Sequence, residues 1–465
     1  MMDNFFRIIT LSRIVQSLGI LFILLTSAFF IIHYFPPALA SKSVLDKMPE
    51  INDPNLELEL VFREDIKSSS MAFLGSDDIL LLDKNDGTVH RIINGALLEK
   101  PLLDVKVANK HERGMLGIAT TASNNGGGTK YVFLYYTESF NEDGNDICTA
   151  DYCEPGNDPL GNRLYRYELK DNKLVYPKLL LDLPATPGPT HNGGAIQIGP
   201  DNNLYVPSGD IHGQSSEKSI TKAQNFKNGT DPDGRSGILV VTQDGKPVNR
   251  SEAILGDKHP LNFYYAYGIR NSFGIDFDPL TGNLWDTENG PSFGDEINLV
   301  EPGFNSGWMQ VQGNWKLVLP PTAEDFIPGD EIFNLDTLEN SDFEGKGKYS
   351  PPKFIWKIPV GVTAVKFLNS NKLGEEYEND MFVGDFNNGR LYHFELNENR
   401  TELSFQDGSL KDGIVDENEE PEEAIVAEGF GSITDIEVGP DSLLYVLSRL
   451  EDEANIFRII PRSSE

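Results

Sequence analysis

The sequence predicts an all-β protein, and more narrowly a six-bladed β-propeller of four-stranded blades. Short apolar-rich runs recur between turn-forming clusters, as in KYVFLYYTES (130–139) and NRLYRYEL (162–169). Such runs are typical of β-strands, and no long helical period follows residue 50. One hairpin also recurs: IQIGPDNNLYV, IDFDPLTGNLWD and IEVGPDSLLYV each contain a strand, a proline-containing turn and a second strand.

The spacing of this hairpin predicts the propeller. Its turn prolines are Pro200, Pro279 and Pro440, so the hairpin returns after 79 and then 161 residues. A period of about 80 residues suits blades with insertions, and about 400 residues then make roughly six blades. We expect the propeller to span residues 58–463, with the last strand joining the first blade. Two unrelated β-sandwiches would not require one hairpin at a fixed period.

Residues 1–40 are predicted to be a signal peptide or a membrane anchor. Two arginines precede an apolar run from Leu18 to Ile32, and Ala38-Leu39-Ala40 offers a small-residue cleavage site. The run is near the upper length of a signal peptide and short for a transmembrane helix, which favours export with cleavage. Residues 41–57 would form a linker.

The net charge limits the kinds of binding partner that we expect, and the cysteine content bears on the redox state of the protein. The 72 acidic and 39 basic residues give a net charge of −33, which excludes nucleic acid and disfavours anionic membrane surfaces. Membrane contact is therefore expected only through the N-terminal segment, if it is retained. An extracytoplasmic protein meets oxidising conditions, so the only two cysteines, Cys148 and Cys153, are expected to form a disulfide.

The first repeated hairpin carries polar residues at both ends. If Ile198 pairs with Leu204, His191 lies beside Asp210 or Ile211. A carboxylate bonded to one imidazole nitrogen fixes the tautomer and strengthens the other nitrogen as a base. Such a pair either removes a hydroxyl proton from a substrate or only ties down a loop.

The second hairpin presents an arginine at the equivalent position. Arg270 precedes Pro279 by nine residues, as His191 precedes Pro200. Equivalent blade positions face the same rim of a propeller, so the imidazole and the guanidinium are expected side by side.

The returning strand of the second hairpin suggests a metal site. Gly290 follows Leu284 by six residues, as Asp210 follows Leu204. The carbonyl oxygens of Gly290 and Pro291 could bind a hard cation on the same rim. A polar turn is the alternative.

Three motifs resemble one known family: HNGGAIQIGPDNNLYVPSGD, ERGMLGIAT and YGIRNSFGIDFDPLTGNLWDTENGPSFGDEINLVEPGFNSGW. They are similar to the soluble quinoprotein glucose/sorbosone (aldose sugar) dehydrogenases over roughly Leu58 to Pro461. The resemblance implies a six-bladed propeller that binds pyrroloquinoline quinone (PQQ) and calcium. It also implies oxidation of an aldose at C1 to the lactone, with hydride transfer to PQQ and an external electron acceptor.

The resemblance also assigns the reacting residues and those beside the cofactor. His191 corresponds to the base that takes the C1 hydroxyl proton, and Asp210 to its orienting partner. Arg270 is similar to the arginine that polarises the quinone oxygens, with Asn271 beside it. Glu112 matches a position that contacts cofactor or substrate.

Calcium would have two sites by the same resemblance. Gly290 and Pro291 would offer carbonyl oxygens to the cofactor-facing ion, and Glu296 would bind a structural ion. Ser306 stands where the family often has a tyrosine near calcium, which argues against the structural ion.

The cofactor clamp departs from the family pattern. Asn387 stands where the family has a lysine that holds the carboxylates of PQQ, and Ser432 and Thr434 replace an Arg-x-Arg pair. Three cations are thus missing for a ligand with three carboxylates, which predicts weakened PQQ binding because charge-assisted hydrogen bonds are the strong ones.

Three hypotheses follow. The first is a calcium- and PQQ-dependent sugar dehydrogenase with an altered clamp, favoured by the four polar rim residues His191, Asp210, Arg270 and Asn271. The second is a propeller without cofactor that binds an extracellular carbohydrate or protein. The third is a calcium-dependent lactonase or other hydrolase that uses the His–Asp pair.

Overall fold

The computed structural model confirms the all-β class. It describes residues 48–121, 129–140, 159–211, 220–248, 255–318, 327–331, 342–405, 408, 410–416, 421–450 and 453–463. Residues from Pro49 to the C-terminus form one compact unit, which begins ahead of the expected boundary at residue 58. The helices of the described part are short 3₁₀ turns: η3 (Lys222–Gln224), η4 (Leu261–Phe263), η6 (Glu375–Tyr377) and η7 (Glu422–Ala424).

The first half of the unit folds into consecutive, mainly antiparallel sheets. The strands of the first sheet are β3 (Ser68–Gly75), β4 (Asp78–Asp83), β5 (Thr88–Ile93), β6 (Ala96–Leu97) and β7 (Leu103–Asp104). The second sheet contains β8 (Met115–Thr120), β9 (Tyr131–Glu138), β10 (Gly161–Lys170) and β11 (Lys173–Leu183). The third contains β12 (Gln197–Ile198), β13 (Asn203–Ser208), β14 (Gly237–Thr242), β15 (Tyr264–Tyr267), β19 (Phe304–Asn305) and β23 (Lys348–Tyr349).

The second half repeats the arrangement. One sheet contains β16 (Ser272–Phe277), β17 (Leu284–Glu288), β18 (Asp295–Val300), β24 (Phe354–Trp356) and β29 (Ile414–Val415). The next contains β25 (Val362–Phe367), β26 (Met381–Asp385), β27 (Arg390–Leu396), β28 (Leu403–Ser404), β30 (Ile425–Glu428) and β1 (Glu50–Ile51). The last contains β31 (Ser432–Val438), β32 (Leu444–Leu450), β33 (Glu453–Pro461) and β2 (Leu56–Glu64), and a small sheet contains β20 (Val311–Gln312), β21 (Trp315–Val318) and β22 (Ile327–Glu331).

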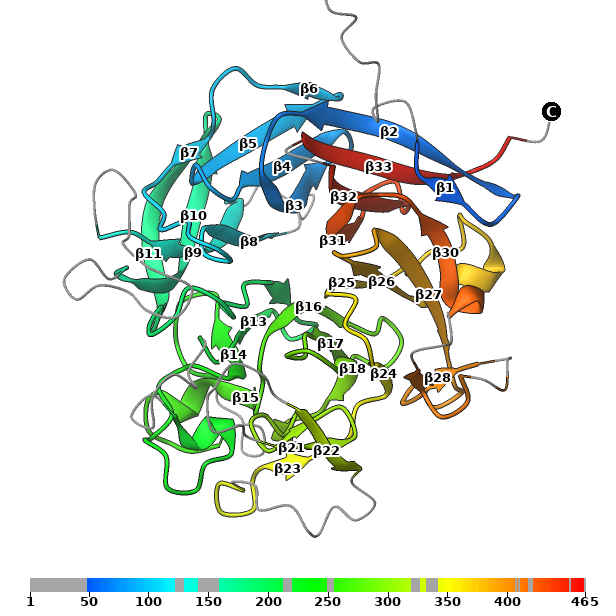
Figure 1. The fold of residues 1–465 in the computed structure, drawn as a ribbon. Helices are drawn as coiled ribbons and strands as arrows, with labels where there is room; N and C mark the ends of the chain where they lie inside the picture. The colour runs from blue at the N-terminus through cyan, green and yellow to red at the C-terminus, as the bar shows by residue number, and fades with distance from the viewer. Residues whose placement is uncertain are drawn as a thin grey trace, which may run out of the picture. The chain divides into compact units, whose positions relative to one another are not determined.

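These sheets surround a common axis, as Figure 1 shows. Their end strands meet there, because β3 contacts β8 and β31, and β25 contacts β16 and β31. Two of the larger sheets have the expected four strands, whereas the others carry additional short strands such as β19 and β29. Each of the six larger sheets thus contains the expected four strands, and in four of the sheets short strands are added to them.

Each sheet is covered by its neighbours on both faces, which explains the nearly unbroken apolar strands. The second strand of several sheets is buried almost throughout, as in β4 (DILLLD) and β26 (MFVGD). Leu80 and Leu82 of β4 belong to the same buried cluster as Val132 and Leu134 of β9, so the core lies between adjacent sheets. Alternation is weak in such strands because neither face meets water.

The repeated hairpins have the predicted form. Ile198 pairs with Leu204, Phe277 with Leu284 and Val438 with Leu444 across their turns. The equivalent ends of β12, β16 and β31 therefore lie at the same end of the axis, which sets up the site described below.

The ring of sheets is closed by the N-terminal strand β2 and not, as expected, by the C-terminal strand. β33 does pair with β2, from Leu56 opposite Pro461 to Glu64 opposite Ala454. However, β2 is not part of the first sheet; it is the outer strand of the sheet formed by β31, β32 and β33. The N-terminal strand thus completes the last sheet, which corrects the expectation that the last strand completes the first.

Some predicted features lie outside the described residues. These are the segment 1–40 and the cysteines Cys148 and Cys153, whose roles stay predictions. In the part of the chain that is described, no helix is both long and apolar enough to span a bilayer.

Candidate active site

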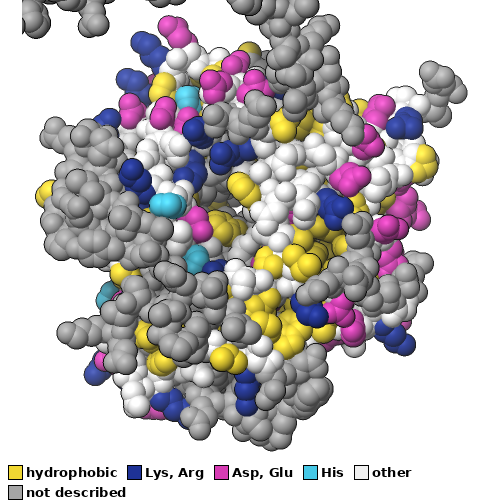
Figure 2. Space-filling view, viewed as in Figure 1, with side chains coloured by type: hydrophobic (Ala, Val, Ile, Leu, Met, Phe, Trp, Pro, Cys, Tyr) yellow, Lys and Arg dark blue, Asp and Glu magenta, His cyan; other side chains and the backbone are white. Residues whose placement is uncertain are grey.

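A central pocket of about 760 Å³ opens at one end of the axis. Its lining comes from all six end strands that face the axis, β3, β8, β12, β16, β25 and β31. Figure 2 shows the central hollow, with Lys and Arg side chains gathered beside it on the side of β3 and β4. A concave site of this volume is typical for a small ligand or cofactor.

His191 and Asp210 form the expected pair beside this pocket. His191 Nδ1 lies 2.6 Å from Asp210 Oδ1, and both side chains are buried. A carboxylate accepts from Nδ1–H, so Nε2 of His191 is the ring nitrogen that can take up a proton. The pairing predicted from the hairpin register is therefore present, and the role of His191 as a base stays a prediction.

Trp308 holds the second oxygen of Asp210. Its indole Nε1 donates to Asp210 Oδ2 over 2.8 Å, and the backbone N–H of Asp210 donates to the carbonyl of Arg270. Burial alone would raise the pKa of Asp210. The charge and hydrogen bond of His191, aided by Arg270 and Trp308, outweigh burial, so the pKa lies below its usual value.

Arg270 lies beside the His–Asp pair, as its hairpin position predicts. Its guanidinium stacks over Trp308, 5.3 Å from the ring centroid, and its Nη1 donates to the carbonyl of Asn289. Burial lowers the pKa of Arg270, and Asp210 and Glu112 oppose that effect. The Nε of Arg270 is buried and has no hydrogen-bond partner among the described residues.

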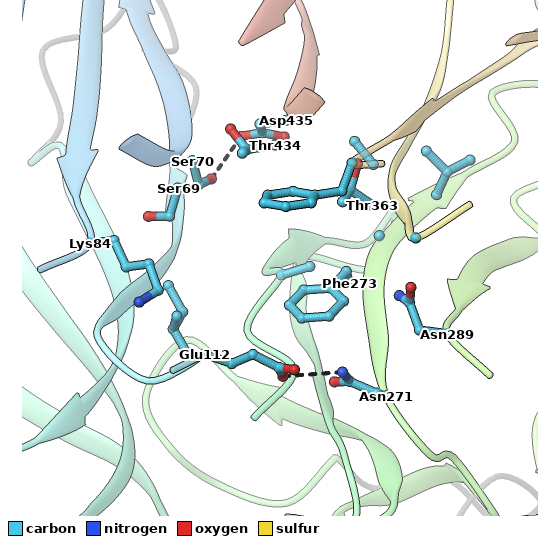
Figure 3. A pocket seen from close by; sticks show the side chains of 18 of the residues that line it. Ser69, Ser70, Lys84, Glu112, Asn271, Phe273, Asn289, Thr363, Thr434 and Asp435 are labelled. Atoms are coloured by element: carbon cyan, nitrogen blue, oxygen red, sulfur yellow. Dashed lines mark hydrogen bonds between the residues drawn. The ribbon is translucent and has the colours of Figure 1, made fainter. Parts of the chain in front are cut away.

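Glu112 connects the His191 hairpin with the Arg270 hairpin. Its Oε2 accepts from the backbone N–H of His191 over 2.6 Å and from Asn271 Nδ2 over 3.2 Å. Figure 3 shows Glu112 and Asn271 joined at the base of the view, below Phe273. Asn271 Oδ1 is buried and has no hydrogen-bond partner in the described structure.

The HNGG motif is explained by the backbone around His191. His191 itself has φ 61°, a left-handed conformation that is costly for a residue with a side chain. Gly194 has φ 127°, and a Cβ there would lie 2.6 Å from Leu116 Cβ. Glycine therefore allows the chain to turn tightly against β8 and to deliver the imidazole to the pocket.

Gly290 and Pro291 also line the pocket, as predicted. The N–H of Gly290 donates to Asp295 Oδ1 over 2.8 Å, and Asp295 Oδ2 accepts from the N–H of Gly361 over 2.7 Å. Asp295 thus fixes two loops of the rim together. Whether the carbonyl oxygens of Gly290 and Pro291 bind calcium stays a prediction.

Glu296 does not line the pocket but lies behind it in β18. It is buried directly opposite Glu288 of β17, and Ser306 Oγ lies 2.7 Å from Glu288 Oε2 and 3.4 Å from Glu296 Oε2. Burial raises the pKa of Glu296 to about 8, against hydrogen bonds from Gly313 and Asn298. Within the described residues, no three acidic, imidazole or thiol groups converge as a metal site.

Sequence reasoning missed three residues of the site. Trp308 lies in a quoted motif, but its bond to Asp210 joins residues 98 positions apart. Lys84 and Arg449 line the pocket although neither belongs to a motif. The three departures from the family pattern lie nearby: Asn387 and Thr434 line the pocket, and Ser432 pairs directly with Arg449.

Comparison with models of known protein families identifies the family of this chain. The model of the glucose/sorbosone dehydrogenase family matches residues 67–458, which include every site residue described above. The chain belongs to this family. It is therefore an enzyme of a family of sugar dehydrogenases.

The following relatives are similar to this chain at low sequence identity. Aldose sugar dehydrogenase YliI of Escherichia coli K12 is 22% identical over 399 residues, covering 85% of this chain and 90% of that protein. The apo structure of the soluble E. coli aldose sugar dehydrogenase has a TM-score of 0.60 at 18% identity, over 88% of this chain and 100% of that one. The PQQ-bound aldose sugar dehydrogenase of Streptomyces coelicolor has a TM-score of 0.57 at 18% identity, over 89% and 100%. These structures support the propeller-type fold.

Proposed function

We propose that the protein is a PQQ- and calcium-dependent aldose dehydrogenase that oxidises a sugar at C1 to the lactone. The observation that carries the proposal is the chain of hydrogen bonds from His191 through Asp210 to Trp308, with Arg270 stacked on the same indole. A His–Asp pair that only fixes a loop would not need a cation nearby. Hydride removal from an alcohol uses both a base for the hydroxyl proton and a cation that stabilises the developing negative charge.

The residues of the chain divide the reaction between them. Bound PQQ would supply the acceptor for the hydride that leaves C1. His191 Nε2 takes the proton of the C1 hydroxyl, and Asp210 stabilises the imidazolium that forms. The low pKa of Asp210 keeps it ionised for this task. Arg270 offers its guanidinium to the oxygens on which negative charge develops.

The polar groups around the pocket suit a ligand rich in oxygen. Four residues that line the pocket each have a buried polar atom without a hydrogen-bond partner among the described residues: Arg270 Nε, Asn271 Oδ1, Thr434 Oγ1 and Arg449 Nε. Buried polar atoms are seldom left unpaired, so these donors and this acceptor indicate a ligand that completes them. PQQ carries carboxylate and quinone oxygens for the donors and ring N–H for the acceptor.

Calcium is part of the proposal on two grounds. Gly290 and Pro291 border the pocket, and backbone carbonyl oxygens such as theirs are ligands for hard cations. Glu288 and Glu296 lie opposite one another in adjacent strands, both are buried, and Ser306 Oγ is close to both carboxylates. A cation there would offset the repulsion between the two carboxylates.

The finer architecture and location belong to the same proposal. We infer six blades, because six sheets contribute a strand to the pocket around the axis. We also infer export, since residues 1–40 have the pattern of a signal segment and the body of the protein is strongly acidic. Edman sequencing of the mature N-terminus after expression in a bacterial host tests the second point.

The test of the proposed function is a calorimetric titration with PQQ. The protein is stripped of metal, reloaded with calcium and titrated, and a screen of aldoses with an artificial electron acceptor follows. Saturable binding together with sugar oxidation is the expected result. Absence of binding at high micromolar PQQ contradicts the proposal and favours a propeller that binds its ligand without a redox cofactor.

A further inference from the structure

Besides Lys67, Arg270 and Lys366, two further cations line the pocket at positions that differ from those of the family clamp. Lys84 follows β4, and Arg449 lies near the end of β32. Both line the pocket together with Asn271 and Thr434. In Figure 3, Lys84 lies on the side of the pocket opposite Asn289.

Arg449 occupies a position that relates directly to a missing family arginine. Ser432 of β31 and Arg449 of β32 are partners across the antiparallel ladder. Directly opposed residues share one face of the sheet, with Cβ atoms about 4.5–5.5 Å apart. A guanidinium at position 449 of β32 can therefore reach the same region of the pocket as a guanidinium at position 432 of β31.

Lys84 brings a second charge to the same place. Its Nζ donates to the carbonyl of His111 over 2.7 Å and to Asn85 Oδ1 over 3.3 Å, both neutral acceptors. Burial, followed by the charge of the nearby Arg449, lowers the pKa of Lys84 to about 8, and the charges of Glu112 and Asp83 oppose this effect. Two half-buried cations close together cost free energy unless an anion joins them.

The acidic groups nearby are already engaged. Glu112 accepts from His191 and Asn271, and Asp83 accepts from the backbone of Asn85 and Asp86. Asp435 of β31 accepts from Ser70 and Met71 of β3. Among the described residues no ion pair joins Lys84 or Arg449 to a carboxylate, although the chain has a net charge of −33.

We propose that Lys84 and Arg449 form a relocated carboxylate clamp, which binds the anionic edge of a planar aromatic polycarboxylate. The inference rests on the proposed function for naming PQQ as that ligand. Lys84 acts as a point charge and Arg449 as a fork that accommodates a carboxylate in two hydrogen bonds. The clamp takes the place of the cations lost at positions 387, 432 and 434.

The first experiment compares two ligands on the calcium-loaded protein by calorimetry: PQQ, and benzene-1,3,5-tricarboxylate, which has the carboxylates but no quinone. Lys84→Gln and Arg449→Gln should each weaken the binding of both ligands by about 10- to 100-fold, as expected for a charge-assisted hydrogen bond. Lys178→Gln is the control. Lys178 is exposed, pairs with Asp244 and does not line the pocket, so the affinity should stay within about twofold.

The second experiment moves the guanidinium across the ladder. The double variant Arg449→Gln/Ser432→Arg returns the cation to the family position and should recover the affinity to within about threefold of the unaltered protein. A merely structural role of Arg449 would give no such recovery. Arg449→Lys, which keeps the charge but not the fork, serves if Arg449→Gln does not fold, and should lose less affinity than the neutral variant.

The outcomes separate the clamp from the proposed function. Tricarboxylate binding that depends on Lys84 and Arg449, without PQQ binding, supports the clamp and refutes PQQ as cofactor. PQQ binding that neither variant weakens overturns the clamp and leaves the proposed function standing. Failure of both ligands to bind the unaltered protein overturns both.

Discussion

The two sides of the pocket hold their charges in different ways. On the side of the repeated hairpins, His191 is bonded to Asp210, Asp210 to Trp308, and Arg270 lies over the same indole. On the other side, Lys84 has only neutral acceptors and Arg449 has an unpartnered, buried Nε in the described structure. A group that must react in one orientation is fixed by the protein, whereas a group that binds a ligand is left for the ligand to complete.

The largest effect is expected at His191. His191→Ala should lower the turnover of sugar oxidation by about 10²- to 10⁴-fold, because it removes the base, while the affinity for PQQ changes little. Dye-linked steady-state kinetics and calorimetry on the same preparation measure the two quantities. Full turnover in His191→Ala would show that another group takes the proton. It would also contradict the assignment of His191 as the fixed reacting group of its side of the pocket.

Removal of calcium should affect the catalytic side and the Lys84–Arg449 side of the pocket differently. A chelator is expected to lower turnover by at least about 10²-fold, because the cation at the Gly290–Pro291 rim would no longer polarise the reacting oxygens. The binding of benzene-1,3,5-tricarboxylate to Lys84 and Arg449 should be much less affected. Restored activity after calcium addition, but not after magnesium, supports the expected site; activity that is indifferent to the chelator counts against it.

The pH dependence of polycarboxylate binding tests the role of Lys84 on its side of the pocket. Lys84, with its pKa of about 8, is charged below that pH and loses its charge as the pH rises. The affinity for polycarboxylates should therefore be constant below about pH 8 and fall by up to about tenfold per pH unit above it. In Lys84→Gln this decline should vanish. Calorimetry between pH 6.5 and 9.5, chosen as roughly bracketing the pKa, measures it; equal slopes in both proteins would exclude Lys84 from the clamp.

The smallest effect concerns Trp308. Trp308→Phe removes the hydrogen bond to Asp210 Oδ2 and should reduce turnover about 3- to 30-fold, with little change in PQQ affinity. Trp356→Phe is the matched control, because Trp356 is equally buried and its Nε1 has no partner among the described residues. Equal losses in the two variants would mean that packing, and not the hydrogen bond, explains the result.

The catalytic side could be predicted from the sequence because its groups are local. His191 and Asp210 lie at the two ends of one hairpin, so their contact follows once Ile198 is paired with Leu204. Arg270 follows from the repetition of that hairpin. The short apolar-rich runs between turn-forming clusters and the recurrent hairpin likewise suffice for the all-β class.

The clamp side could not be predicted, because its residues meet only through long-range register. Lys84 belongs to an ordinary polar turn, DKNDG, and nothing in that stretch indicates a pocket. Arg449 becomes meaningful only when its partner across the ladder is known to be Ser432. The additional strands β19 and β29 pair in parallel with distant segments, so local pattern does not reveal them either.

The pairing of β2 with β33 has a consequence for how the chain reaches its native state. The ion pair between Glu59 and Arg458 joins residues 399 positions apart, and β33 is the strand with which β2 pairs in the described part of the chain. Until synthesis has passed residue 453, β2 is an open strand edge that invites misassociation. Contacts this distant in sequence slow folding. A ribosome that stalls late would thus leave a nearly finished polypeptide dependent on chaperones and exposed to proteases, although all of its pocket residues have already been synthesised.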